Sequence, residues 1–126
     1  MRESGILVDI HPEADHKRVL IEESGSWGEI GLVERSRSFF PDITSSEKVL
    51  ARTIESGLFK PITRTTYERI DYVESTADWA TYITCPRTEG YSGDAVEISK
   101  ALARLDAGEE CLRVHTKFNV ATYARL

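Results

Sequence analysis

The sequence predicts an α/β fold, of α+β form as an isolated chain, with a mixed, largely antiparallel sheet and about three helices. Two short apolar runs joined by a turn-rich segment, and a long alternating stretch near the C-terminal end, are typical of antiparallel strands. Three segments with apolar residues three and four positions apart are typical of helices. The chain has 126 residues, 40% of them hydrophobic, which predicts one domain, 1–126, with its own core.

The first half of the chain contains three predicted strands. Residues 5–10 are nearly continuous apolar residues closed by His11 and Pro12, which is typical of a strand buried on both faces. Residues 19–22 and 29–33 flank a segment rich in Gly and Ser. This arrangement predicts a β-hairpin with a loop of about five residues.

Two longer strands are predicted in the second half. Residues 62–73 are rich in Thr, Tyr and Ile and contain no helix breaker, which favours an extended conformation. The last stretch alternates in polarity, which predicts a half-buried strand. Its two faces are Leu112, Val114, Thr116, Phe118 and Val120 on the apolar side, and Arg113, His115, Lys117 and Asn119 on the polar side.

The first predicted helix begins with Thr44 and Glu47, whose spacing fits a capping box. It continues to about Ser56, and Gly57 occupies the position where a left-handed residue is favoured. The residues predicted to face inward are Val49, Leu50, Thr53 and Ile54.

Two further helices are predicted, each with a polar residue at its start. The second begins at Ser75 and places Trp79 and Tyr82 on one inward face. The third begins at Asp94, whose side chain can cap the helix. Between them, the polar residues 87–93 are predicted to form a mobile loop.

Composition excludes several classes of protein. The formal charge of −5 argues against nucleic-acid binding, and no apolar run approaches the length of a membrane span. The opening residues are too polar for a signal peptide, so a cytoplasmic location is expected. Cys85 and Cys111 lack CxxC spacing, which predicts reduced thiols and no metal site.

Once the elements are placed in order, a family resemblance emerges at the start of the chain. Residues 1–12, Met-Arg-Glu-Ser-Gly-Ile-Leu-Val-Asp-Ile-His-Pro, resemble the fifth strand of class I (Rossmann-like) S-adenosylmethionine-dependent methyltransferases. In that family a turn of the type Leu-Arg-Pro-Gly-Gly leads into the strand. Glu3, Ser4 and Gly5 stand here in place of Pro-Gly-Gly.

The rest of the chain resembles the C-terminal half of the same enzymes. A helix ending in residues 55–59 precedes a long strand with Arg64 and Tyr67. Residues 72–82 resemble the D-S-x-x-x-x-x-Y helix of some members, and another helix leads to a final strand ending in residues 122–126. In the family the last two strands form an antiparallel hairpin at the sheet edge.

The resemblance implies a half-domain without autonomous methyl transfer. The family binds its cofactor with a glycine-rich loop and an acidic residue in an N-terminal half that this chain lacks. Gly25, Gly28 and Gly31 lie inside the predicted hairpin instead of between a strand and a helix. We therefore expect that no S-adenosylmethionine is bound by this chain alone.

The missing neighbour of the first strand implies an open sheet edge. We expect self-association as a homodimer, rearrangement of the hairpin 18–34, or a complementing chain to cover this edge. Two other functions remain open: part of a methyltransferase completed by another chain, or a module that binds a small ligand.

Five residues are candidates for a site. Asp9 and His11 lie at the carboxyl end of the first predicted strand, where ligands of open α/β sheets bind. The resemblance implies that this is the edge of the active-site mouth, where a base such as His11 can serve a substrate, although both residues can also simply end the strand. Trp79, Tyr82 and Tyr91 can line a substrate pocket, although aromatic residues at helical spacing also pack in cores.

Overall fold

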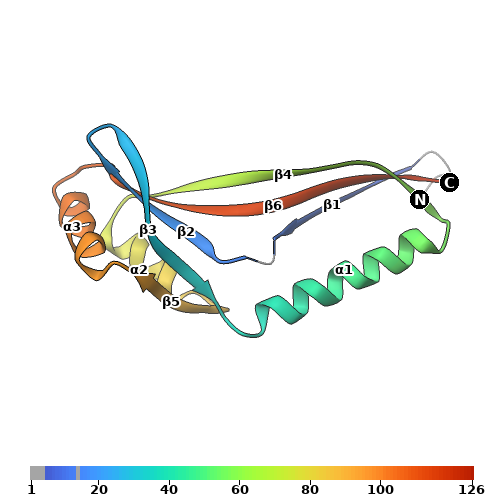
Figure 1. Ribbon diagram of the computed structural model, residues 1–126, viewed down its shortest axis with the longest axis horizontal. Coiled ribbons are helices and arrows are strands. Elements are labelled where there is room, and N and C mark those ends of the chain that lie inside the picture. Colours follow the sequence, from blue (N-terminus) through green and yellow to red (C-terminus); the bar gives the residue numbers. More distant parts are fainter. Residues whose placement is uncertain (1–4, 14) are drawn as a thin grey trace. The chain divides into compact units, whose positions relative to one another are not determined.

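The computed structural model describes residues 5–13 and 15–126 and confirms the predicted fold class. It contains three helices and a mostly antiparallel six-stranded sheet (Figure 1). Hydrogen bonds connect the strands in the order β1-β6-β2-β3-β5, and β4 pairs with β6. The elements are β1 (Ile6–Pro12), β2 (Lys17–Glu23), β3 (Ser26–Arg35), α1 (Phe39–Glu55), β4 (Phe59–Val73), α2 (Thr76–Thr84), β5 (Thr88–Gly93), α3 (Ala95–Asp106) and β6 (Leu112–Arg125). The Met1–Ser4 part of the resemblance lies outside the described residues.

The chain divides into two compact units, and each is described by itself. Unit 1 comprises the described residues of 1–15, 38–68 and 117–126. Unit 2 comprises residues 16–37 and 69–116. Strands β4 and β6 contribute residues to both units. That residues 1–126 behave as one domain stays a prediction.

Unit 1 is built on a three-stranded antiparallel sheet with β6 in the middle. On one side β1 pairs with β6 along its whole length. On the other side β4 pairs with β6, where Thr63 Oγ1 lies 2.5 Å from Thr122 Oγ1 and the Tyr67 ring stacks on Phe118. Each step forward along β4 is matched by a step back along β6, so this pair is antiparallel too.

Helix α1 of unit 1 begins earlier than the sequence predicts. Its N-cap is Ser38, with no side-chain cap, so the capping box of Thr44 and Glu47 is wrong. These two residues lie within the helix, where backbone N–H groups already donate to the preceding turn. Val49, predicted to face inward, is 61% exposed, whereas Gly57 has the predicted positive φ of 80° just beyond the helix.

The predicted hairpin forms the start of unit 2. Strands β2 and β3 pair antiparallel, and β2 also pairs with the first part of β6. The loop contains only Ser24 and Gly25, fewer residues than predicted, and their φ angles are 51° and 82°. Positive φ at both central residues is typical of the tight turns that suit the twist of a hairpin.

The predicted mobile loop 87–93 is wrong, because most of it forms strand β5 beside β3. Gly31 lies opposite Gly93 in this pair. A Cβ atom on Gly31 would lie 2.6 Å from the backbone oxygen of Ser92, and one on Gly93 would lie 2.5 Å from the Gly31 Cα. The two glycines therefore permit a close approach that side chains would prevent.

The predicted start of α2 at Ser75 and the predicted cap of α3 at Asp94 are confirmed. The Ser75 hydroxyl accepts a hydrogen bond from the backbone N–H of Asp78 (3.1 Å). Asp94 Oδ1 accepts from the backbone N–H groups of Val96 and Glu97 (3.0 Å each). The helices and the sheet share one buried core: Val19, Ile21, Val33, Val73, Trp79, Ile98, Ala101, Leu105, Cys111, Leu112 and Val114.

The polar face predicted for β6 is partly wrong. His115 is 6% exposed and Asn119 is 8% exposed. Three consecutive buried residues around His115 show that both faces of the strand are covered there. In unit 1 Asn119 and Ala121 are buried, whereas Phe118 and Val120 on the predicted apolar face are only half-buried. The buried side of the strand therefore changes along its length.

Candidate functional site

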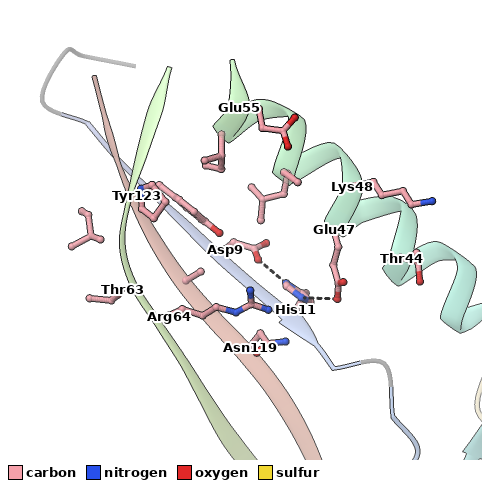
Figure 2. Close-up of a pocket in the computed structure, with 16 residues that line it drawn as sticks. Asp9, His11, Thr44, Glu47, Lys48, Glu55, Thr63, Arg64, Asn119 and Tyr123 are labelled. Atoms are coloured by element: carbon pink, nitrogen blue, oxygen red, sulfur yellow. Dashed lines mark hydrogen bonds and ion pairs between the residues drawn. The ribbon is translucent and has the colours of Figure 1, made fainter. Parts of the chain in front are cut away.

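A cavity of about 790 Å³ lies within unit 1, between α1 and the three-stranded sheet (Figure 2). This volume falls within the range of ligand pockets, roughly 300–1,000 Å³. We call it the α1 pocket. Its lining residues are Asp9, His11, Thr44, Glu47, Lys48, Leu50, Ala51, Ile54, Glu55, Pro61, Ile62, Thr63, Arg64, Asn119, Ala121 and Tyr123.

The floor of the α1 pocket follows from the register of the strands. Asp9 is paired with Ala121, and His11 is paired with Asn119. The contacts between β4 and β6 place Arg64 on the other side of Ala121. Paired residues project to the same face, so Asp9 and Arg64 flank a methyl group. The small side chain of Ala121 leaves space between two charged residues.

Two of the predicted site residues meet in this pocket. His11 Nδ1 lies 2.6 Å from Asp9 Oδ2, since residues two apart on a strand share a face. His11 Nε2 lies 3.5 Å from Glu47 Oε1 of α1 (Figure 2). The Asp9 carboxylate thus orients the imidazole, and Nε2 is the ring atom next to the helix. His11 lies within β1, one residue before its end. A catalytic role for the pair stays a prediction.

Arg64 contributes the positive charge on the pocket floor. Figure 2 shows its side chain extending from β4 toward Asp9 and His11, whereas Lys48 on α1 points away from the pocket. Among the residues that the structure describes, no carboxylate lies within ion-pair distance of the Arg64 guanidinium. Asp9 is engaged by His11 instead. The pocket therefore contains a cation without an anionic partner in this part of the chain.

The predicted aromatic residues lie in unit 2 and do not line the α1 pocket. Trp79 is 5% exposed, and its ring packs edge-on against Tyr91 with 5.5 Å between the ring centroids. Burial and the nearby Asp71 raise the pKa of Tyr82 to about 12. These contacts are those of packed core side chains. A role for Trp79, Tyr82 and Tyr91 in substrate binding stays a prediction.

Sequence reasoning did not assign Glu47 or Arg64 to a site. Glu47 is on the same helical face as Leu50 and Ile54, which are three and seven residues further along. That spacing was the available signal for a residue facing the sheet. Arg64 had no comparable signal, because β4 shows no alternation of apolar and polar residues around it.

The cysteines lie apart from the α1 pocket. Both are free; Cys85 is half-buried and Cys111 is buried. Burial raises the pKa of the Cys111 thiol, which favours its protonated form. Within residues 5–13 and 15–126, no group of three or more His, Cys, Asp or Glu side chains is arranged to hold a metal ion.

Comparisons with protein-family models, with curated proteins and with solved structures find no match for this chain. None of the helices that the structure describes is both long enough and apolar enough to cross a membrane. The functional argument therefore depends on the geometry of the α1 pocket.

Proposed function

We propose that unit 1 binds a small amphipathic organic molecule in the α1 pocket. The observation that carries this proposal is one cavity in which an apolar wall faces a charged floor. Leu50, Ala51 and Ile54 of α1 form the wall together with Ile62 of β4. Sites for small molecules commonly combine apolar walls with a few convergent polar groups.

The apolar surface that a ligand buries in the pocket sets the expected affinity. Each buried CH₂ group contributes about 0.8 kcal/mol, so a chain of about eight carbons gains roughly 5–6 kcal/mol before other costs. That free energy corresponds to dissociation constants of roughly 0.04–0.2 mM for an unadorned chain. Specific polar contacts would strengthen binding beyond this range.

The test is an NMR titration of the ¹⁵N-labelled protein with 1-octanol. We expect saturable shifts of the amide signals of Ala51, Ile62 and Ala121. Ala51→Trp should weaken these shifts, because an indole at this position occupies part of the cavity along the apolar wall. Val49→Trp is the matched control, since Val49 is exposed on the same helix and does not line the pocket. Equal shifts in both variants, or no shifts in the wild type, would contradict the proposal.

The methyltransferase resemblance supplies a further ligand for this titration. Strands β4 and β6 pair antiparallel, but β6 lies inside the sheet, whereas the family hairpin lies at the sheet edge. S-adenosylhomocysteine is the product that such enzymes form from their cofactor. Saturable binding of this molecule would favour part of a methyltransferase over a general ligand-binding module. Calorimetry on the folded chain measures it directly.

A second candidate function is self-association through β1, as the resemblance implies. Among the described strands, β1 pairs with β6 alone and is therefore an edge strand. Its outward side chains Ile6, Val8 and Ile10 are 62%, 54% and 59% exposed. Antiparallel pairing centred on Val8 places Ile6 opposite Ile10 of the second copy and keeps Asp9 away from its own equivalent.

Sedimentation equilibrium of two variants tests this self-association. We expect the wild type to dimerise with concentration and Val8→Lys to remain monomeric, because a charge on an edge strand opposes pairing. Val49→Lys places the same charge at an equally exposed valine on α1 and should still dimerise. A monomeric wild type at high concentration would remove this candidate.

A further inference from the structure

We infer that the molecule bound in the α1 pocket is an amphipathic monocarboxylate whose carboxylate pairs with Arg64. This inference rests on the proposed function, because it names the class of ligand for the same pocket. It follows from which charged groups are already engaged, from the shape of the floor, and from the total charge of the lining.

The first argument is the pairing of the charged groups on the floor. Asp9 lies 2.6 Å from His11, which also approaches Glu47. Arg64 lines the same floor, and its guanidinium has no carboxylate within ion-pair distance in the part of the chain described here. A guanidinium presents two parallel N–H donors that fit a carboxylate. Because the carboxylates of Asp9 and Glu47 approach His11, a carboxylate of the ligand can accept the hydrogen bonds of the Arg64 guanidinium.

The second argument is the space over Ala121. Strands lie about 4.8 Å apart, so the backbones of Asp9 and Arg64 are separated by roughly 10 Å. Ala121 lies between them and contributes only a methyl group. A carboxylate above this methyl group reaches Arg64 from one side. His11 Nε2, a buried atom with no hydrogen-bond partner among the described residues, lies on the same floor.

The third argument concerns the charge of the ligand. The lining contains three carboxylates, Asp9, Glu47 and Glu55, against Lys48 and Arg64. Of these two cations, only Arg64 extends over the floor toward Asp9 and His11 (Figure 2). One available cation suits a single negative charge, whereas a phosphate dianion would meet repulsion from the surrounding carboxylates. The apolar wall of α1 then accommodates the hydrocarbon part of the molecule.

The experiment compares three eight-carbon probes: octanoate, 1-octanol and octylamine. Each is titrated against the whole protein by the NMR shifts described above. We expect octanoate to bind about tenfold or more tightly than octanol, because charge-assisted hydrogen bonds add to the same apolar contact. Octylamine should bind more weakly than octanoate. Tighter binding of octylamine, or equal binding of octanoate and octanol, would overturn the inference.

Two charge-removing variants locate the effect. Arg64→Gln should reduce octanoate binding to the level of octanol while leaving octanol binding unchanged. Lys48→Gln removes a positive charge from the same lining and should keep the preference for octanoate, since Lys48 points away from the floor. Loss of the preference in both variants, or in neither, would contradict the role of Arg64.

The outcomes separate this inference from the function on which it rests. Failure of all three probes to bind contradicts the proposed function itself. Binding of octanol without a preference for octanoate leaves the ligand-binding function standing and removes only the carboxylate. Correct folding of Arg64→Gln is shown by its unchanged binding of octanol and by wild-type amide signals of unit 1 residues outside the pocket, such as Val8 and Phe118.

Discussion

The helices of the two units differ in how they are held. In unit 2, α2 and α3 each begin with a side-chain cap; α2 buries Trp79, and α3 buries Ile98, Ala101 and Leu105. In unit 1, α1 is longer than either, has no side-chain cap and buries only Phe39. The core of unit 2 is closely packed around these residues, whereas α1 leaves a cavity of about 790 Å³ beneath it. We therefore expect unit 2 to contribute most of the stability, while the proposed ligand site belongs to unit 1.

The largest expected effect is a difference in stability when one apolar side chain is truncated in each unit, a core residue in unit 2 and a pocket residue in unit 1. Trp79→Ala should reduce the free energy of unfolding by about 3–5 kcal/mol, because it leaves a void in a closed core. Leu50 lines a cavity that already exists. Leu50→Ala should therefore reduce the free energy of unfolding by only about 1 kcal/mol. Urea denaturation followed by circular dichroism measures both. Equal losses would show that the units are packed alike.

The second expected effect is a dependence of unit 2 stability on alkaline pH. The pKa of Tyr82 is about 12 in the folded protein, above its ordinary value of 10. The resulting stabilisation is fully present below pH 10 and is lost as the pH rises toward 12. Because Tyr82 is partly exposed, solvent screening should limit the loss to about 1–2 kcal/mol.

Urea denaturation at pH 9 and pH 11.5 measures this loss. Tyr82→Phe should remove it, because phenylalanine has no proton to release. Tyr72→Phe, at an exposed tyrosine of β4, serves as the matched control. The comparison of variants cancels the contribution of Lys17, whose pKa is lowered mainly by burial. If Tyr82→Phe lost as much stability between pH 9 and pH 11.5 as the wild type, Tyr82 would not be the source of the pH dependence.

The smallest expected difference concerns the starts of the helices. Asp94→Ala removes a side chain that accepts two backbone hydrogen bonds and should cost about 1 kcal/mol. Ser38→Ala at the start of α1 removes no side-chain cap of the helix and should cost less than Asp94→Ala. Thermal unfolding of both variants gives the comparison. A larger loss for Ser38→Ala would mean that α1 is held at its start after all.

The parts of the fold that depend on neighbouring residues could be predicted from the sequence. The start of α2 at Ser75 and the cap of α3 at Asp94 depend on residues within three positions, and both predictions are confirmed. The capping box at Thr44 was equally local but wrong, because a helix that starts earlier satisfies the same backbone groups. Strand β5 was missed because its Gly and Ser residues are also typical of loops.

The candidate site divides in the same way. Asp9 and His11 are two residues apart on one strand, so their shared face was predictable. The neighbourhood of Arg64 and Ala121 depends on the register between β4 and β6, which are far apart in the sequence. Local patterns do not encode such a register. The charge of the floor therefore became visible only in the assembled sheet.

The pairing of β1 with β6 has a consequence for how the protein is made. Ile6 is joined to Ala124, so nearly the whole chain must be synthesised before the floor of the α1 pocket can close. Contacts of this sequence separation form slowly. During that interval Ile6, Val8 and Ile10 have no partner strand, and apolar strands in this state are prone to aggregate on and after the ribosome. A chain interrupted before Asn119 would contain β1 and α1 without the residues of β6 that line the α1 pocket and form most of the pairs with β1.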